Sequence, residues 1–352
     1  MTAAAPDSTP SAPSAPSAPS GRLAARGVHI GPYSLGCAQL GNLYREMSDE
    51  TATEIVNAAW EGGIRHFDTA PHYGLGLSED RLGRTLRGRP RDEVVVSTKV
   101  GRLLEPNPTF TGEVDAQGFV VPARLIRRWD FSADGVRRSI EGSLTRLGLD
   151  RIDLALVHDP EENTADPDQG LREAIPALAE LRREGVIRAI GIGTKSISSL
   201  LRFAENADVD AVMIAGRYTL LNQEALAELL PACAERSIDV LNAGVFNSGI
   251  LASPRPPEEA VFDYGPAGRS LIDRVTRMAE LCDRFGTSIP RLALQFAASH
   301  PSIRSVVFGA DSAAQVVSNL ELAASPTAQS ALWEELAAAD LLPVDAARLA
   351  TA

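Results

Sequence analysis

Short apolar runs alternate with amphipathic stretches from Tyr33 onward, and this alternation constrains the fold more than any other feature of the chain. It is typical of parallel strands joined by crossover helices. Eight strands are expected, near residues 33–38, 64–68, 93–98, 153–158, 187–192, 210–215, 238–243 and 304–308. Eight strand–helix units that close on themselves make a (β/α)8 TIM barrel, which is the predicted α/β fold class.

Helices are expected near residues 49–62, 78–87, 132–148, 170–184, 196–205, 222–236, 268–285 and 312–324. Ser48, Ser78 and Ser132 each stand before acidic residues and an apolar stripe, a pattern typical of helix N-caps. Residues 287–300 and 329–340 do not fit the eightfold repeat. They are predicted to be extra C-terminal helices packed outside the barrel.

Residues 1–25 are rich in Ala, Ser and Pro and are expected to form a disordered tail, followed by a single barrel domain over 26–345. The tail lacks the basic and apolar regions of a secretory signal. No run of about eighteen apolar residues, the length that spans a membrane, occurs. A cytoplasmic location is therefore expected.

The chain has 34 basic and 46 acidic residues, a net charge of −12. This charge disfavours nucleic acid or an anionic membrane as a partner and favours a small-molecule ligand. Cys37, Cys233 and Cys282 are far apart and show no metal-ligand spacing, so reduced cysteines of a cytosolic protein are expected. The oligomeric state is left open.

Three predicted strands end in ionisable residues. Asp68 ends the second strand, Lys99 follows the third, and His158 ends the fourth, while Tyr73 stands five residues after Asp68 on a loop. Catalytic groups of a TIM barrel sit at the C-terminal ends of its strands, so these four side chains are expected to share one cavity.

The four residue types suit hydride transfer at a carbon that bears an oxygen, because that oxygen must gain or lose a proton. Lys99 would lower the pKa of Tyr73 from its reference value of about 10, and Asp68 would keep the lysine charged and oriented. His158 would orient the reacting oxygen. Each residue alone also fits an ordinary role in a turn or on the surface, but their joint occurrence on successive strands favours catalysis.

Two further histidines flank these positions. His66 shares the inward face with Asp68 and is expected to be a hydrogen-bonded interior residue, while His72 is a weaker candidate for the pocket rim and the substrate. A metal-hydrolase alternative would use Asp68, His72 and His158 as ligands. It leaves Lys99 and Tyr73 without a role, so no metal is predicted.

Residues 103–131 follow the third strand and are rich in Pro, Gly and charge. Long loops of this kind are either functional or disordered. This one is expected to close over the substrate, with Trp129 or Phe131 forming an apolar wall for a sugar face.

From about residue 30 to 325 the chain resembles the aldo-keto reductases, which are nicotinamide-dependent barrel enzymes. The resemblance rests on Phe67-Asp68-Thr69-Ala70, Tyr73-Gly74, Ser78-Glu79 and Leu82-Gly83, followed by Lys99 and His158. It implies a catalytic tetrad of Asp68, Tyr73, Lys99 and His158. Residues 72–79, 215–221 and 246–251 further resemble the sugar-oxidising branch, with its L-fucose and D-threo-aldose 1-dehydrogenases and the related pyridoxal 4-dehydrogenases.

This resemblance implies an NAD(P)-dependent oxidoreductase that oxidises an aldose of the L-fucose, D-arabinose or L-galactose type at its anomeric carbon to the lactone, with Tyr73 as general acid/base. Oxidation of pyridoxal is the alternative substrate reaction. A second alternative is a non-catalytic, cofactor-sensing regulatory subunit, as in the potassium-channel β subunits of the family.

The resemblance also implies cofactor-binding positions, namely Lys195, Arg217, Tyr218, Phe246, Asn247, Ser248, Gly249, Gly309, Asp311, Gln315 and Asn319. The usual partners of the nicotinamide are replaced here by 193–195, Ala215 and Ala243, so Arg217, Tyr218 and Phe246 are expected substitutes.

Cofactor choice is expected to depend on the turn after the last strand. NADP-preferring relatives carry cations in that turn and on the next helix, whereas this chain has Gly309, Asp311 and Gln315. A carboxylate repels a 2′-phosphate but accepts a hydrogen bond from a ribose hydroxyl, so NAD is expected rather than NADP. Alternatively, Asp311 only caps the last barrel helix together with Ser312.

Overall fold

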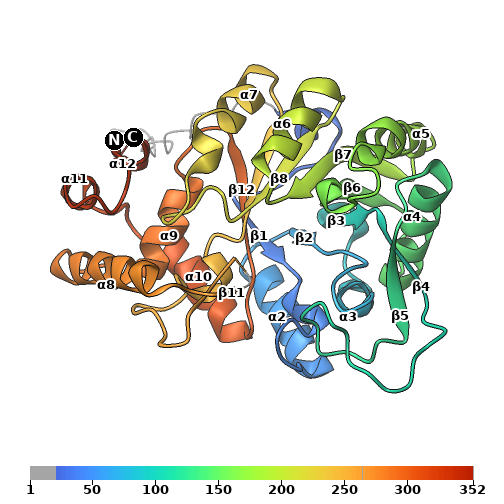
Figure 1. The fold of residues 1–352 in the computed structure, drawn as a ribbon, viewed down its shortest axis with the longest axis horizontal. Coiled ribbons are helices and arrows are strands. Elements are labelled where there is room, and N and C mark those ends of the chain that lie inside the picture. The colour runs from blue at the N-terminus through green and yellow to red at the C-terminus, as the bar shows by residue number, and fades with distance from the viewer. Residues whose placement is uncertain (1–20, 264, 352) are drawn as a thin grey trace, which may run out of the picture.

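The computed structural model describes residues 21–263 and 265–351. Its core is a closed barrel of parallel strands in the order β1-β12-β9-β8-β7-β6-β3-β2, which confirms the predicted TIM barrel (Figure 1). These strands are β1 (Tyr33–Gly36), β2 (His66–Asp68), β3 (Val95–Val100), β6 (Ile152–His158), β7 (Ile187–Thr194), β8 (Ala211–Ala215), β9 (Asp239–Ala243) and β12 (Ile303–Phe308). All eight expected strands are present at the predicted places.

The helices that surround the barrel are α2 (Asp49–Glu61), α3 (Leu77–Leu86), α4 (Ala133–Leu147), α5 (Ile175–Arg183), α6 (Ile197–Asn206), α7 (Leu229–Glu235), α9 (Ile289–Ala298) and α10 (Ala313–Ala324). The extra C-terminal helix predicted over 329–340 is confirmed as α11 (Ser330–Ala338), which is followed by α12 (Val344–Thr351). The segment 287–300 is helical as predicted, but α9 packs against β12 and α10 in the barrel layer, whereas α8 (Arg269–Arg284) packs outside it against α9 and α11 (Figure 1). Short helical turns are η1 (Gln39–Gly41), η2 (Arg91–Glu93), η3 (Pro160–Glu162), η5 (Glu224–Leu226), η6 (Asn247–Gly249) and the π-helical η4 (Gly170–Ala174), which continues into α5.

Two of the three predicted serine caps are confirmed. Ser48 Oγ accepts from the amide of Thr51 at the start of α2, and Ser132 Oγ accepts from the amide of Gly135 at the start of α4. Ser78 is instead inside α3, where its buried hydroxyl donates to the carbonyl oxygen of Cys37 at 2.7 Å. A tertiary partner competes with capping here, so α3 begins after Gly76, whose φ of 92° suits glycine.

The first described residues pack against the barrel. Residues 1–20 of the predicted tail lie outside the described residues, whereas its end forms α1 (Arg22–Ala25). Leu23 is buried in an apolar cluster with interior barrel residues, and its amide donates to Asp239 Oδ2 at 2.8 Å. This part of the tail therefore belongs to the folded domain.

Two hairpins are inserted between barrel elements. The segment after β3 contains the antiparallel pair β4 (Arg102–Pro106) and β5 (Leu125–Trp129), and the chain between them extends toward α2 and α3 (Figure 1). The segment after β9 contains β10 (Val261–Phe262) and β11 (Gly265–Pro266). The first hairpin gives regular structure to what the sequence pattern presents only as a loop.

Within the described ranges, no helix has both the length and the apolar character needed to cross a membrane.

Candidate active site

A buried ion pair joins the ends of β2 and β3. Lys99 Nζ lies 2.7 Å from Asp68 Oδ2, and their side chains are only 3% and 5% exposed. The ammonium also donates to the carbonyl oxygen of Thr69 at 2.9 Å. The register between the strands pairs Asp68 with Ser97, two residues before Lys99 on the same face of β3, which brings the two charges together.

Tyr73 lies beside this pair, with Lys99 Nζ 4.6 Å from its ring centroid. Burial raises the pKa of Tyr73, Lys99 lowers it, and Asp68 raises it further. The net pKa is above that of an ordinary tyrosine, contrary to the expectation that Lys99 would lower it, because burial outweighs the neighbouring ammonium. For Lys99 itself, burial favours the neutral amine, but Asp68 and Tyr73 raise its pKa above the ordinary value.

His158 completes the cluster at the end of β6. Its ring is perpendicular to that of Tyr73, with 6.1 Å between centroids, and also packs edge-on against His72 at 5.5 Å. Burial lowers the pKa of His158 well below the usual value, and the charges of Arg102 and Lys99 act in the same direction. The imidazole is therefore neutral at neutral pH and suited to donate or accept one hydrogen bond.

A chain of buried hydrogen bonds supports Asp68 from below. Ser97 Oγ donates to Asp68 Oδ1 at 2.7 Å, and His66 lies between Ser97 and Ser34 with contacts of 2.9 and 2.8 Å. Burial lowers the pKa of His66 to about 4. The prediction of a satisfied interior histidine is confirmed, and both carboxylate oxygens of Asp68 have partners.

The next residue after His158, Asp159, also faces the cluster. Its Oδ2 lies 3.3 Å from His158 Nε2 and 2.6 Å from Arg102 Nη2. Burial raises the pKa of Asp159 to about 6, although Arg102 opposes the shift. Asp159 directly follows the end of β6, and no local sequence pattern marks it as part of the site.

The segment between β4 and β5 covers the cluster through Phe119. This buried ring lies 5.2 Å from His72 and 6.0 Å from Tyr73, centroid to centroid. Arg127 makes a two-pronged ion pair with Asp115, at 2.7 and 2.9 Å, and donates to the carbonyl oxygen of His72 at 2.8 Å. These contacts hold the segment against the loop that carries Tyr73.

The two aromatic residues predicted for the substrate wall have different surroundings. Phe131 is fully buried, stacks on Trp129 and lies so close to Gly101 that a Cβ there would overlap its ring. Its predicted substrate role is wrong, because the ring fills the core under the hairpin. Trp129 remains partly exposed, with the Arg102 guanidinium 4.5 Å from its ring.

His72, the weaker candidate for the pocket rim, lies beside the cluster. Its ring is enclosed by Phe119, Tyr73 and His158, and its buried Nδ1 has no hydrogen-bond partner among the described residues. Burial lowers the pKa of His72 to about 2, with Arg102 and Arg127 reinforcing the effect. His72 is therefore a neutral group with an unpaired polar atom beside the cluster.

All the predicted cofactor residues follow the neighbouring strands β7, β8, β9 and β12, which continue around the barrel from β6. Lys195 is exposed after β7, and Phe246, Gly249, Gly309 and Asn319 are partly exposed. Residues 247–249 all have positive φ, and Ser248 is exposed while Asn247 Oδ1 is buried without a partner in the described part of the chain. An unpartnered acceptor and an open turn fit a polar ligand along this rim.

Two of the predicted cofactor residues are already engaged within the chain. Tyr218 is fully buried, stacks on Phe296 at 4.9 Å and shares a hydrogen bond with Ser299, so its predicted place at the cofactor is wrong. The ring turns outward to α9 because the chain bends sharply after β8. Arg217 makes a two-pronged pair with Asp263 at 2.9 and 2.8 Å, which holds it against the β10–β11 hairpin.

In the turn after β12, the Asp311 side chain does not cap the helix that follows. Ser312 Oγ accepts from the amide of Gln315, and Gln315 Oε1 accepts from the amide of Asp311 at 2.7 Å, so Ser312 and Gln315 cap the start of α10 in a box-like arrangement. The Asp311 carboxylate does not take part in that box and pairs with Arg45 at 2.9 Å. Sequence reasoning missed Arg45, because a long-range partner on the loop after β1 leaves no local pattern.

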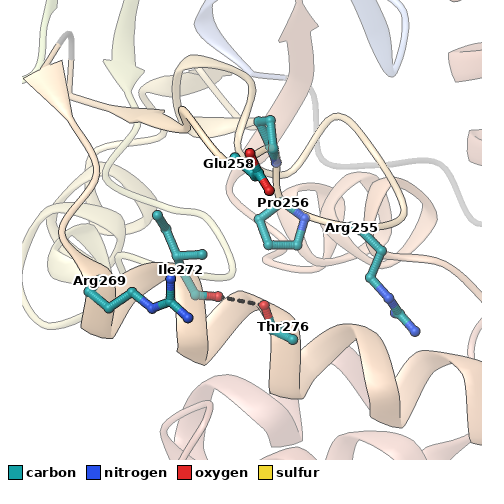
Figure 2. A pocket seen from close by; sticks show the side chains of 7 residues that line it. Arg255, Pro256, Glu258, Arg269, Ile272 and Thr276 are labelled. Atoms are coloured by element: carbon teal, nitrogen blue, oxygen red, sulfur yellow. Dashed lines mark hydrogen bonds between the residues drawn. The ribbon is translucent and has the colours of Figure 1, made fainter.

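A surface pocket of about 390 Å³ lies elsewhere, between residues 255–258 and α8 (Figure 2). Its lining includes Arg255, Pro256, Glu258 and Ile272, and none of the predicted site residues. Across the described ranges no group of three or more His, Cys, Asp or Glu side chains is arranged to hold a metal. The arrangement at the barrel mouth is thus one of acid–base residues beside a polar rim.

Comparison with known proteins places this geometry in a family. Residues 33–339 match the family model described as the aldo/keto reductase family. A D-threo-aldose 1-dehydrogenase of Pseudomonas sp is 48% identical over 322 residues, which cover 91% of this chain and 97% of that protein. A pyridoxal 4-dehydrogenase of Microbacterium luteolum is 37% identical, covering 85% of this chain and 91% of that protein.

Among solved structures, the holo form of an aldo-keto reductase from Bacillus halodurans superposes with a TM-score of 0.71 at 26% identity, covering 90% of this chain and 93% of that one. The family match spans most of the barrel, and the sequence relatives are aligned along nearly their whole length. The chain belongs to the aldo/keto reductase family and is a nicotinamide-dependent oxidoreductase.

Proposed function

We propose that this protein is an NAD-linked dehydrogenase that oxidises the anomeric hydroxyl of an aldopyranose to the lactone. In the proposed step the hydride leaves C1 for the nicotinamide, and the proton of the C1 hydroxyl goes to Tyr73. The C1–H and O–H bonds break while the C1 carbonyl forms, and the Tyr73 phenolate becomes a neutral phenol. The similarity to a D-threo-aldose 1-dehydrogenase supports a sugar as the substrate.

The observation that carries this proposal is the Lys99 ammonium, held 2.7 Å from Asp68 and 4.6 Å from the Tyr73 ring centroid. A fixed cation beside a phenol stabilises its ionised form, which is the form needed as general base. In this proposal, His158 would hydrogen-bond the reacting oxygen. Because the pKa of Tyr73 is above its ordinary value, oxidation should become faster as the pH rises into the alkaline range.

The cofactor would lie along the rim after β7, β9 and β12, beside Lys195, residues 246–249 and residues 309–319. When bound, it accepts the hydride. Asn247 Oδ1 offers a buried acceptor without a partner in the described ranges, and Asp311 offers an acceptor near the start of α10. Arg217 would bind the cofactor only if its guanidinium could contact the cofactor and Asp263 at the same time.

The test is NADH formation by the purified protein with L-fucose, D-arabinose, L-galactose and pyridoxal as substrates. We expect oxidation of at least one sugar with a higher kcat/KM than for pyridoxal. Pyridoxal is the second candidate because a pyridoxal 4-dehydrogenase is 37% identical to this chain. Activity with pyridoxal alone would select that candidate, and tight cofactor binding without turnover of any substrate would favour a regulatory role.

We expect Phe119→Ala to raise KM for the sugar about five- to tenfold, because a packed aromatic contact contributes on the order of 1 kcal/mol. The affinity for NAD should remain unchanged, since the Phe119 ring contacts His72 and Tyr73 rather than the cofactor rim. Steady-state kinetics and cofactor titration measure the two effects separately. Phe110→Ala is the matched control, because Phe110 lies in the same segment against Arg124. A larger loss of cofactor affinity than of sugar affinity would assign the segment to the cofactor.

Asp311→Arg should shift the ratio of kcat/KM for NADP over NAD upward by about tenfold or more, the size of one hydrogen bond to a charged group. The wild-type protein should prefer NAD, because the partly exposed Asp311 carboxylate would face a 2′-phosphate. Asp345→Arg repeats the charge reversal on the exposed surface of α12 and should leave the ratio unchanged. Equal or better use of NADP by the wild type would refute the charge argument.

A further inference from the structure

Asp159 places a carboxylate next to the reacting centre that the proposed hydride-transfer step does not use. Its Oδ2 lies 3.3 Å from His158 Nε2, and its side chain remains 19% exposed. The charge is close enough to Tyr73 to raise the pKa of the phenol. The Asp159 carboxylate therefore provides a hydrogen-bond acceptor beside His158.

The backbone directs the side chain to this place at a cost. Asp159 has φ 41° and ψ 54°, a left-handed conformation that is uncommon for residues other than glycine although Asp adopts it more readily than most, and the following residue is Pro160. The amide of Asp159 donates to the carbonyl oxygen of Gly193 at 3.1 Å, which anchors the turn to β7. Uncommon backbone conformations of this kind cluster at functional sites, so the conformation of Asp159 suggests a functional role.

Arg102 holds one oxygen of this carboxylate and leaves the other available. Its Nη2 contacts Asp159 Oδ2 at 2.6 Å and Glu162 Oε2 at 2.7 Å, while its guanidinium packs against Trp129. His158 contacts the same Oδ2, and within residues 21–263 and 265–351 no donor is found for Oδ1. Oδ1 is thus an available acceptor among these residues, on a carboxylate whose partner Arg102 packs against the partly exposed Trp129.

A pyranose carries hydroxyls on neighbouring carbons that lie within hydrogen-bond distance of one another. With the C1 oxygen at Tyr73 and His158, the C2 hydroxyl would come within reach of the carboxylate. An ionised carboxylate only accepts hydrogen bonds, so it selects a hydroxyl donor. A bound sugar without that hydroxyl would cover the carboxylate and leave its oxygen unpaired, which is costly.

Building on the proposed sugar oxidation, we propose that Asp159 is a specificity-determining residue that accepts a hydrogen bond from the hydroxyl next to the reacting carbon. The preferred substrates are then aldoses with a free 2-hydroxyl, and 2-deoxy aldoses are poor substrates. The selection depends on the carboxylate itself, with Arg102 fixing its orientation.

The experiment compares kcat/KM for D-arabinose and for 2-deoxy-D-ribose, which is the same sugar without its 2-hydroxyl. A site built to pair a substrate hydroxyl discriminates strongly against the analogue that lacks it. We expect the wild type to prefer D-arabinose by about 100-fold or more. Asp159→Gly, which tolerates the left-handed backbone, should reduce the preference to less than about fivefold. Asp159→Asn keeps a neutral acceptor and should give an intermediate preference.

The deoxy sugar also serves as the internal control for structural damage. A variant that loses the same factor on both sugars acts through His158 or the fold, and this result would overturn the proposal. Glu162→Gln removes the other carboxylate on Arg102 and should retain the wild-type preference; loss of the preference there would assign the selection to Arg102 instead.

The wild type separates this inference from the proposed function. If it oxidises D-arabinose and the deoxy sugar equally well, Asp159 has no such role although the protein is an aldose dehydrogenase. If it oxidises no aldose of the substrate panel, the proposed function itself is wrong and the inference is rejected with it.

Discussion

Replacing Tyr73 with Phe is expected to lower kcat for sugar oxidation by a factor of about 100 to 10,000, the range typical of a lost general acid/base. The change removes only the hydroxyl, so the ring should still pack against Lys99, His158 and Phe119. Cofactor affinity, measured by titration of NADH fluorescence, should therefore stay within about twofold of the wild type. Unchanged turnover would remove Tyr73 from the chemistry.

Tyr33→Phe is the matched control for this variant. Tyr33 begins β1, at the end of the barrel opposite to the cluster, and it is partly buried like Tyr73. Removal of the Tyr33 hydroxyl should not change kcat. A comparable fall in both variants would point to a general effect on the barrel rather than to proton transfer.

Asp68→Asn is expected to lower the free energy of unfolding by about 3–5 kcal/mol, because it leaves the buried Lys99 ammonium without its counterion. Chemical denaturation measures the loss. Asp80→Asn is the control, since Asp80 pairs with Arg84 at 3.0 Å on the surface of α3, and breaking such an exposed pair costs about 0–1 kcal/mol. A loss from Asp68→Asn no larger than from this control would show that the buried pair contributes little.

The same variant should change the pH dependence of oxidation. In the wild type, the pKa of Lys99 is raised above its ordinary value of about 10, so the pair contributes its full stability below that value. The contribution is lost only as the pH rises through the higher folded value. Without Asp68, burial favours the neutral amine, and Lys99 should lose its proton at a lower pH. We therefore expect kcat/KM to rise with alkaline pH in the wild type and to fall in Asp68→Asn.

The sequence alone was sufficient to predict the barrel and to bring the ionisable residues at its strand ends together. Apolar strands such as 152–158 are buried along their whole length, and this leaves a pattern that does not depend on contacts made elsewhere. Because parallel strands point the same way, side chains at the ends of β2, β3 and β6 must meet at one mouth of the barrel. For this reason the strand pattern by itself groups Asp68, Lys99 and His158.

Local patterns failed where a distant residue supplies the partner. Ser78 has the pattern of a helix cap but donates to Cys37, and Asp311 has the pattern of a cap but pairs with Arg45. Tyr218 was expected at the rim but stacks on Phe296 of α9. In each case a long-range hydrogen bond, ion pair or apolar contact outweighs the local preference, and its energy is invisible in the neighbouring sequence.

Only the tertiary structure decided which loop residues reach the reactive cluster. The sequence shows several aromatic residues after β3, but the hairpin register pairs Arg102 with Trp129, directs Phe131 into the core and brings Phe119 onto His72 and Tyr73. The left-handed turn at Asp159 likewise aims its carboxylate at His158. The backbone direction of a loop depends on which segments pack together in the folded protein. No single stretch of the sequence therefore predicts which loop residues lie next to the site.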